Sequence, residues 1–271
     1  MPRARSRSAL SRLCGLAMSR LCGLAVAAAL GLSGAGAPTA AAAPARATVH
    51  PGDAAATTCP RPKVMRRREV VYGQDPVNKL VAITFDDGPH PTWTPRVLDV
   101  LRRYHVKATF FVLGVNAERY PALVARIRRE GHTVANHTYT HIDTSGAGPK
   151  VASQLDRTQA AIKKATNFTP CLFRPPYGAK SNASVALTRR KGMQTVLWDV
   201  DTSDYERPAS FDIVQRVLTG VKPGSIVLMH DGGGPREETL GALPEIIKGL
   251  KAKGYRFVTL NKLLKVRERY A

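Results

Sequence analysis

The sequence predicts an α/β protein built as a closed or nearly closed barrel of parallel strands, with an open doubly wound sheet as the alternative. Two observations lead to this prediction. Short runs rich in β-branched and aromatic residues alternate with helix-length amphipathic segments from residue 79 to residue 265. Seven such strands fall within about 190 residues, and strict alternation of strand and helix implies parallel pairing.

The expected elements follow one another along the chain, separated by turn residues. The strands are expected at Leu80–Phe85, Ala108–Leu113, Thr133–Asn136, Leu172–Arg174, Thr195–Asp199, Ser225–Met229 and Arg256–Leu260. The helices are expected at Thr94–Tyr104, Ala117–Glu130, Lys150–Ala165, Ala183–Lys191, Phe211–Leu218 and Glu237–Lys251. In these helical segments apolar residues recur three and four positions apart, which gives each helix one face to bury.

Residues 1–43 differ in character from the rest of the chain. Arginines, the last of them Arg20, precede the apolar stretch Leu21–Leu32, and an Ala-, Gly- and Pro-rich segment follows. This order is typical of a secretory signal peptide, and cleavage is expected between Ala40 and Ala47. Met18 offers a second start of translation, and a mobile cytosolic tail is the alternative interpretation. Residues 44–78 lack periodicity and are expected to link the signal to a domain at residues 79–265, so we predict a secreted or cell-wall-associated protein.

The chain is strongly basic. Its 271 residues include 41 Lys and Arg against 20 Asp and Glu, a net charge of +21, which becomes +16 without residues 1–43. With 44% apolar residues the chain can form one core, which excludes a disordered polyelectrolyte. No apolar run in the body reaches the roughly 18 to 20 residues of a membrane span. For a secreted monomer, this charge favours association with anionic cell-wall polymers over nucleic acid.

Polar side chains gather at the C-terminal ends of the expected strands, where the active sites of α/β barrels form. They are Asp86 and Asp87, His137 and His141, Arg174 and Tyr177, Asp199 and Asp201, and His230 and Asp231. Each pair alone has an ordinary explanation, since Asp-Asp-Gly-Pro can simply end a strand and histidines four apart can face solvent. Together, one carboxylate and two histidines offer three ligands to a metal ion that activates water. A second carboxylate could then serve as base and a histidine on another strand as acid.

Five ordered segments carry a resemblance to a known family. They are Thr84–Pro89 (TFDDGP), His137–His141 (HTYTH), Arg174–Gly178 (RPPYG), Asp201–Tyr205 (DTSDY) and Leu228–His230 (LMH). In this order they resemble the five motifs of the polysaccharide deacetylases, the NodB homology domain of carbohydrate esterase family 4. The resemblance covers roughly residues 79–264. It implies a distorted (β/α)7, TIM-barrel-like fold and a metal-dependent hydrolase acting on carbon–nitrogen bonds.

The resemblance also implies how water is activated. Asp87, His137 and His141 would hold a divalent ion, zinc most often in this family, with cobalt as a frequent substitute. Metal-bound water would attack the acetyl carbonyl carbon while Asp86 takes its proton. The backbone N–H of Tyr177 would help to stabilise the oxyanion.

The remaining motif residues would complete the site. His230 would protonate the departing amine, because an amide nitrogen leaves poorly as an anion. Arg174 would orient Asp86 and keep it ionised, and Asp201 would do the same for His230. Leu228 would line the small acetyl pocket.

Aromatic residues near the expected site bear on the substrate. The fourth family motif usually ends in Trp, whereas Tyr205 stands here. Trp93, in the loop expected after the first strand, is a further candidate for stacking on a sugar, while Trp198 is expected to lie in the core. The expected substrates are N-acetylglucosamine glycans, either peptidoglycan or chitooligosaccharide. An O-acetyl esterase acting on xylan and an inactive cell-wall-binding protein are the alternatives.

Two of the four cysteines lie outside the expected signal peptide. An even number of cysteines in a secreted protein favours a disulfide, so we expect Cys59 and Cys171 to pair and to tie the linker to the domain. Two free thiols are the alternative.

Overall fold

The computed structural model describes residues 70–73 and 78–266. The predicted signal peptide, its cleavage site and most of the linker lie outside these residues and stay predictions. Within the described part, none of the helices combines the length and the hydropathy that crossing a membrane requires.

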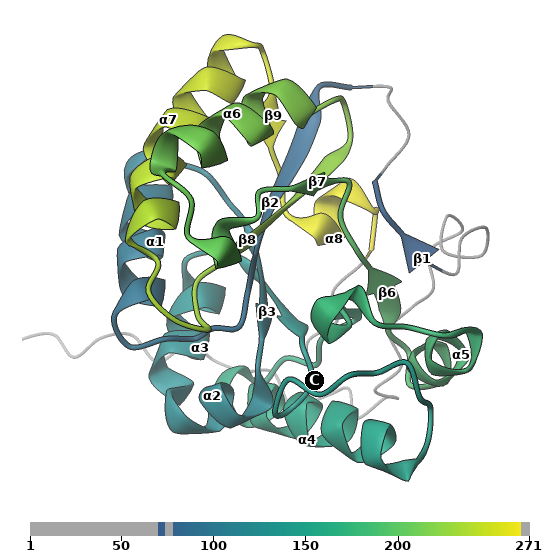
Figure 1. Ribbon diagram of the computed structural model, residues 1–271. Helices are drawn as coiled ribbons and strands as arrows, with labels where there is room; N and C mark the ends of the chain where they lie inside the picture. The colour runs from purple at the N-terminus through teal and green to yellow at the C-terminus, as the bar shows by residue number, and fades with distance from the viewer. Residues whose placement is uncertain (1–69, 74–77, 267–271) are drawn as a thin grey trace, which may run out of the picture. The chain divides into compact units, whose positions relative to one another are not determined.

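One sheet organises the described residues, and all of its strand pairs are parallel. Its strands are β1 (Val70–Val71), β2 (Leu80–Asp86), β3 (Thr109–Val112), β4 (Thr133–Asn136), β5 (Leu172–Phe173), β6 (Gln194–Val196), β7 (Val200–Asp201), β8 (Ser225–His230) and β9 (Arg256–Phe257). They are ordered β1-β6-β5-β4-β3-β2-β8-β7, with β9 added beside the start of β2. The sheet curls into a half-barrel whose edges are β1 and β7 (Figure 1). This confirms the predicted distorted (β/α)7 barrel-like fold.

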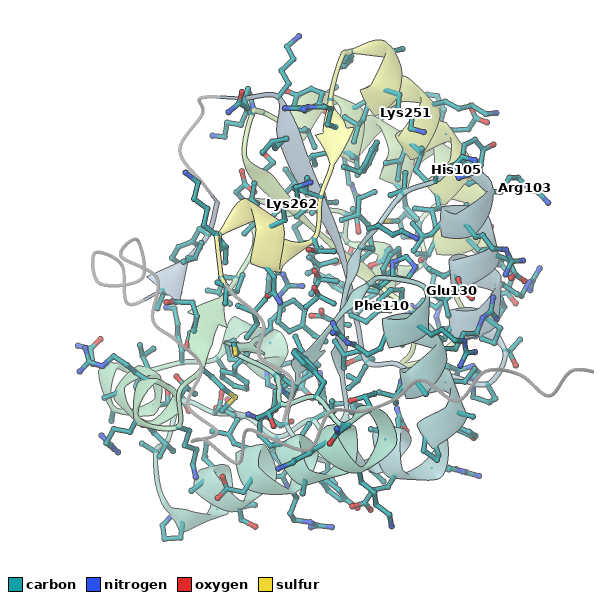
Figure 2. The ribbon with its side chains drawn as sticks, turned by 180° about the vertical axis from the view of Figure 1, so that it is seen from behind. Arg103, His105, Phe110, Glu130, Lys251 and Lys262 are labelled. Atoms are coloured by element: carbon teal, nitrogen blue, oxygen red, sulfur yellow. The ribbon has the colours of Figure 1, made fainter. Side chains whose placement is uncertain are left out.

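Helices surround the outer face of the curled sheet (Figure 1). They are α1 (Trp93–Arg103), α2 (Gly114–Arg119), α3 (Pro121–Arg129), α4 (Pro149–Thr166), α5 (Asn182–Arg190), α6 (Ser210–Gly220) and α7 (Glu237–Ala252), and the short α8 (Leu260–Leu263) follows β9. Helix α7 packs against α1 and α6, and α4 packs against α2, α3 and α5. Arg103 and Lys251 lie in the last turns of α1 and α7 (Figure 2), where a positive charge interacts favourably with the helix dipole.

The strands bury both faces, as expected for a parallel sheet covered on each side. In β2, Val81, Ile83 and Phe85 belong to the core between the sheet and the outer helices. Because side chains alternate along a strand, Ala82 faces the opposite side, where it belongs to the core cluster that contains Leu260 of α8. The β-rich runs of the sequence therefore form a sheet that lies between two hydrophobic cores.

Several elements differ from the predicted ones. The helix expected at Ala117–Glu130 is two helices, because Pro121 starts a new helix after the non-helical Tyr120. The strand expected at Thr195–Asp199 is the shorter β6, and β7 follows it and pairs with a different neighbour. The strand expected at Arg256–Leu260 is the two-residue β9, and Leu260 begins α8. The sequence pattern does not predict the two-residue β1, because so short a segment carries no periodicity.

Candidate active site

The candidate side chains follow the C-terminal ends of neighbouring strands. Asp86 ends β2 and lies level with His230 at the end of β8, because the two strands pair in parallel register. His137 directly follows β4 and Arg174 directly follows β5. Parallel strands end at the same edge of the sheet, so residues nearly 150 positions apart in the sequence, such as Asp86 and His230, meet there.

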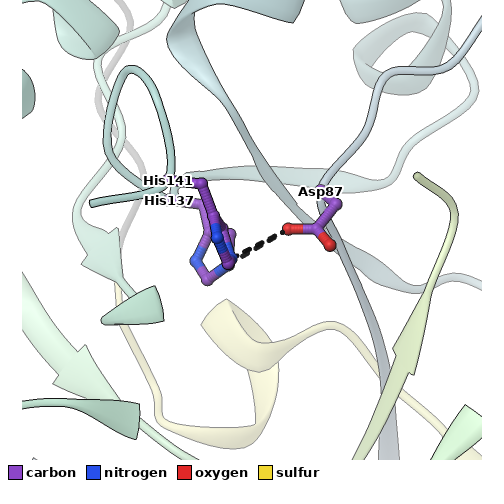
Figure 3. Close-up of side chains that lie close together, drawn as sticks. All are labelled: Asp87, His137 and His141. Atoms are coloured by element: carbon purple, nitrogen blue, oxygen red, sulfur yellow. Dashed lines mark ion pairs between the residues drawn. The ribbon is translucent and has the colours of Figure 1, made fainter. Parts of the chain in front are cut away.

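Asp87, His137 and His141 converge at this edge (Figure 3). One ligand atom from each lies within 4.8 Å of the others. The Asp87 Oδ1 atom is 3.5 Å from Nε2 of His137 and 3.2 Å from Nε2 of His141. The three residues are therefore positioned to bind a metal ion, as the sequence predicts, with two nitrogen ligands and one oxygen ligand.

The chemistry of these ligand atoms fits a cation. The Nδ1 atom of His137 lies 2.8 Å from the carbonyl oxygen of Arg174 and must donate to it, so the lone pair of the neutral ring is on Nε2. Burial lowers the pKa of His137 to about 3, which keeps this lone pair free at neutral pH. The Asp87 Oδ1 atom is buried and has no hydrogen-bond partner among the described residues. A buried oxygen without a partner is costly unless a cation or water satisfies it.

The backbone around Asp87 is closely packed. Asp87 has a positive φ of 73°, and Asn116 Nδ2 donates to its carbonyl oxygen at 2.9 Å. Gly233 lies against its side chain, and a Cβ atom there would come within 2.5 Å of Asp87 Oδ2. Gly233 also has a φ of 70°, so glycine is required both for the turn and for the close approach.

Asp86 is held by Arg174, as the family resemblance implies. Arg174 is fully buried, and its Nη1 donates to Asp86 Oδ1 at 2.8 Å and to Thr84 Oγ1 at 2.7 Å. The other oxygen, Asp86 Oδ2, lies 3.7 Å from His137 Nε2 and so faces the metal ligands. Burial raises the pKa of Asp86 above its ordinary value, although Arg174 and His230 act in the opposite direction. The carboxylate is therefore more basic than a solvated one.

His230 is held by Asp204, which corrects the expectation that Asp201 would hold it. Its Nδ1 lies 2.7 Å from Asp204 Oδ1, and its backbone N–H donates to Asp204 Oδ2 at 2.8 Å. Thr239 Oγ1 donates to the same Oδ2 at 2.8 Å. Burial disfavours the imidazolium, but the hydrogen bond and charge of Asp204 outweigh it, so the pKa of His230 is raised. His230 thus holds a proton to higher pH than a free histidine.

Asp201 lies elsewhere because of its position on β7. It is level with Leu228, two residues before His230 on β8. Its exposed carboxylate accepts hydrogen bonds from Trp198 Nε1 at 3.2 Å and from the backbone N–H of Ser203 at 2.8 Å. Ser203 is left-handed, with φ 49°, and the turn that it forms brings Asp204 beneath the end of β8.

Asp231 is a third buried carboxyl group at this edge, and its environment could not be predicted from the sequence. Thr94 Oγ1 donates to its Oδ2 at 2.5 Å, and its backbone N–H donates to the carbonyl oxygen of Asp86. Burial is the main cause that raises the pKa of Asp231 to about 7, and the neighbouring Asp86 and Asp87 add to it. Asp231 therefore holds a proton to higher pH than a solvated carboxyl group does.

The aromatic residues divide into exposed and buried ones. Tyr177 is 74% exposed and its ring contacts that of His141 edge-on at 4.5 Å, while Tyr205 is 45% exposed and contacts the ring of His230 edge-on at 5.6 Å. Trp93 begins α1 and is buried beside His90, which corrects the expectation that it offers a stacking surface to a sugar. Exposed rings therefore stand on either side of the site, on the β5–α5 and β7–α6 connections.

Two further predicted residues are placed more simply. Leu228 is buried in β8 and lies level with Thr84 and Asp201. Cys171 is buried just before β5, whereas Cys59 lies outside the described residues, so the disulfide stays a prediction.

Comparisons with known proteins agree with this geometry. Residues 73–196 match the family model described as polysaccharide deacetylase. A peptidoglycan-N-acetylglucosamine deacetylase of Bacillus cereus is 43% identical over 190 residues, which are 69% of this chain and 89% of that protein. A chitooligosaccharide deacetylase of Sinorhizobium fredii is 41% identical over 187 residues, 65% of this chain and 87% of that protein. A solved peptidoglycan N-acetylglucosamine deacetylase in complex with 4-naphthalen-1-yl-N-oxidanyl-benzamide has a TM-score of 0.73 at 34% identity, covering 77% of this chain and 99% of the other.

Proposed function

Because this chain belongs to the polysaccharide deacetylase family, carbohydrate esterase family 4, we propose that it is a secreted, zinc-dependent N-deacetylase of bacterial cell-wall glycan. The observation that carries the proposal is the position of Asp86 and His230, level with each other beside the cluster of Asp87, His137 and His141. A base, three metal ligands and an acid at one edge of the sheet are what amide hydrolysis needs.

Asp87, His137 and His141 would hold the ion, and their donor set of two imidazoles and one carboxylate suits zinc. When bound, a divalent ion polarises the acetyl carbonyl and lowers the pKa of water. His137 contributes a neutral ring in a fixed tautomer, because its Nδ1 is tied to the carbonyl oxygen of Arg174.

Asp86 would act as the base. Arg174 holds Oδ1, which leaves Oδ2 to face the metal ligands and to take a proton from the attacking water. The raised pKa of this buried carboxylate makes it a better proton acceptor than a carboxylate in water.

His230 would act as the acid. Its Nδ1 is bound to Asp204, so Nε2 remains to deliver a proton to the departing amine. The raised pKa of His230 keeps that proton in place before the carbon–nitrogen bond breaks. On the other side of the site, beside His141, the backbone N–H of Tyr177 would help to stabilise the oxyanion.

The proposed substrate is the N-acetylglucosamine of peptidoglycan. The names of the Bacillus cereus relative and of the solved neighbour support this choice over chitooligosaccharide. The net charge of +16 that remains without residues 1–43 also favours residence at an anionic cell wall. The exposed rings of Tyr177 and Tyr205 would contact the sugars on either side of the acetyl group that is removed.

The experiment is release of acetate by the purified protein from peptidoglycan, chitooligosaccharide and acetylated xylan. Each substrate is tested after chelation and after addition of zinc or cobalt. The proposal expects metal-dependent acetate, with the highest kcat/KM on peptidoglycan. Release from xylan alone would assign the chain to the esterases of the family, and no release despite bound metal would leave a wall-binding protein. N-terminal sequencing of the protein from culture medium tests secretion and the cleavage site.

A further inference from the structure

The segment between the two histidine ligands has an unusual backbone. Thr138 has a φ of 67° and His141 a φ of 58°, although neither residue is glycine. Such conformations are disfavoured for residues with a Cβ atom and persist only where the surroundings hold them. The position of His141 therefore depends on whatever fixes this turn.

The two ligands are anchored differently. The His137 ring is fixed directly, because its Nδ1 is hydrogen-bonded to the carbonyl oxygen of Arg174. The Nδ1 atom of His141 has no hydrogen-bond partner among the described residues. Its ring packs against those of His137 and Tyr177, and its Nε2 lies 3.2 Å from Asp87 Oδ1. The position of His141 therefore depends more on its own backbone than that of His137 does.

Several hydrogen bonds hold that backbone, and one side chain on α4 makes three of them. The Oε1 atom of Gln154 accepts hydrogen bonds from the backbone N–H groups of Tyr139 at 2.8 Å and Thr140 at 2.7 Å. Its Nε2 donates to Thr140 Oγ1 at 2.9 Å. Gln154 is only 9% exposed, so water competes little for these bonds. Three hydrogen bonds from one buried amide reach the two residues that precede His141.

Neighbouring contacts tie the other end of the turn to the same helix. Asn136 Oδ1 accepts from the backbone N–H of Thr138 at 2.9 Å, and its Nδ2 donates to the carbonyl oxygen of Leu155 at 3.0 Å. The guanidinium of Arg157 lies 3.5 Å from the centre of the Tyr139 ring. The backbone N–H groups of Gly114 and Val115 in α2 donate to the carbonyl oxygens of Thr138 and Tyr139 at 2.9 and 3.0 Å. Helices α2 and α4 therefore both support the turn from His137 to His141.

We infer that Gln154 is a positioning residue for the metal centre, and that it sets metal affinity by holding His141 within reach of Asp87. The inference rests on the proposed metal site. It predicts that the loss of the Gln154 acceptor oxygen loosens the turn at Thr140, lets φ at His141 relax, and moves His141 Nε2 away from its present 3.2 Å from Asp87 Oδ1. Partners that orient metal ligands typically contribute roughly 10- to 100-fold to metal affinity.

The test is a zinc titration of the metal-free full chain against a chromophoric chelator. Gln154→Met preserves the side-chain volume but removes both hydrogen-bonding atoms, and we expect a Kd for zinc raised roughly 10- to 100-fold. Gln159→Met is the matched control, because Gln159 lies on the same helix and its Nε2 donates to the carbonyl oxygen of Pro170, away from the ligands. We expect that control to bind zinc like the unmodified protein. Equal Kd values for the two variants would overturn the inference.

A conservative variant separates positioning from folding. Gln154→Glu keeps two acceptor oxygens and Thr140 can donate its hydroxyl, so this variant should restore most of the affinity. Gln154→Asn is a milder truncation that serves if Gln154→Met does not fold, and it should also weaken binding. The thermal midpoint of each metal-free variant and the visible spectrum of each cobalt-loaded one are recorded alongside. Positioning by Gln154 would be contradicted if Gln154→Met lost affinity for zinc, kept the cobalt spectrum of the unmodified protein, and Gln154→Glu did not restore the affinity. If the unmodified protein bound no metal, the proposed metal centre itself would be rejected.

Discussion

The Nδ1 atom of His230 lies 2.7 Å from Oδ1 of Asp204, and the second oxygen of that carboxylate accepts the backbone N–H of the same histidine. Asp204 is buried, and although burial works against its ionisation, the bonds from His230 and Thr239 lower its pKa. An ionised Asp204 therefore stands behind the imidazole and fixes both its orientation and its charge. Asp201, three residues earlier, has no contact of this kind with His230 and bonds instead to Trp198 and Ser203.

Exchange of Asp204 for Asn should lower kcat for deacetylation by roughly 100-fold or more, the low end of what a positioned acid contributes. The asparagine side chain keeps the shape of aspartate, but it has no charge and lacks the second acceptor oxygen that helps to hold His230. Asp201→Asn is the matched control, and we expect it to change kcat much less. Steady-state acetate release from both variants measures the difference. A larger loss in Asp201→Asn than in Asp204→Asn would assign the role to Asp201 after all.

The pH profile should report the raised pKa of His230. Because this pKa lies above 6.5, the protonated acid persists at neutral pH, and the alkaline limb of kcat/KM should lie above pH 6.5. The same shift stabilises the fold fully below the unfolded pKa of about 6.5, and this stabilisation is lost as the pH rises through the folded value. In Asp204→Asn, burial is opposed only by the weaker effects of Asp86 and Asp87, so the alkaline limb should move to lower pH. If the alkaline limb does not move in this variant, the limb does not report the ionisation of His230.

Asp86→Asn and His137→Ala should fail in different ways. Asp86→Asn removes the base but no metal ligand, so zinc content should stay unchanged while deacetylation is lost. His137→Ala removes one of three ligands and should lose zinc. Metal analysis of dialysed protein together with acetate release distinguishes the two. Residual activity near that of the unmodified protein in Asp86→Asn would exclude this residue as the base.

Arg174→Met should destabilise the fold by about 3–5 kcal/mol, because it leaves Asp86 as a buried charge without its partner. Thr84 Oγ1 and the carbonyl oxygen of Leu197 lose a donor as well. Urea unfolding of metal-free protein measures the change. The double variant Arg174→Met with Asp86→Asn should recover part of the loss, since it removes the unpaired charge. No recovery would place the cost in packing against Phe111 and in the hydrogen bonds to Thr84 and Leu197.

The sequence is sufficient to predict most of the sheet, because each central strand is an apolar run of the right length between helical segments. The sequence is insufficient where the pairing of strands in the folded sheet sets the strand boundaries. The sequence pattern predicts one strand at Thr195–Asp199, but β6 ends at Val196 and β7 begins only at Val200. The pairing of β6 with β1 and β5, and of β7 with β8, sets these boundaries. Pro121 marks the break between α2 and α3, although apolar periodicity alone predicts one helix at Ala117–Glu130.

The metal ligands were predictable because they lie in short motifs that resemble those of a known family: His137 and His141 lie four residues apart, and Asp87 directly follows a strand. The partner of His230 was not. The segment Asp201–Tyr205 contains two aspartates, and only the left-handed turn at Ser203 determines which one lies beneath β8. No pattern of alternating residues predicts that turn. The burial of Trp93 in the first turn of α1 could not be predicted from the sequence either.

Arg174 serves the site through two chemically separate parts of one residue. Its carbonyl oxygen fixes the tautomer of His137, and its guanidinium holds Asp86. Every amino acid has the carbonyl group, but only arginine has the guanidinium. If the chain has the proposed function, a substitution at position 174 would therefore impair hydrolysis while it leaves in place the carbonyl oxygen that orients His137. In variants at this position, metal content would then be no measure of enzymatic activity.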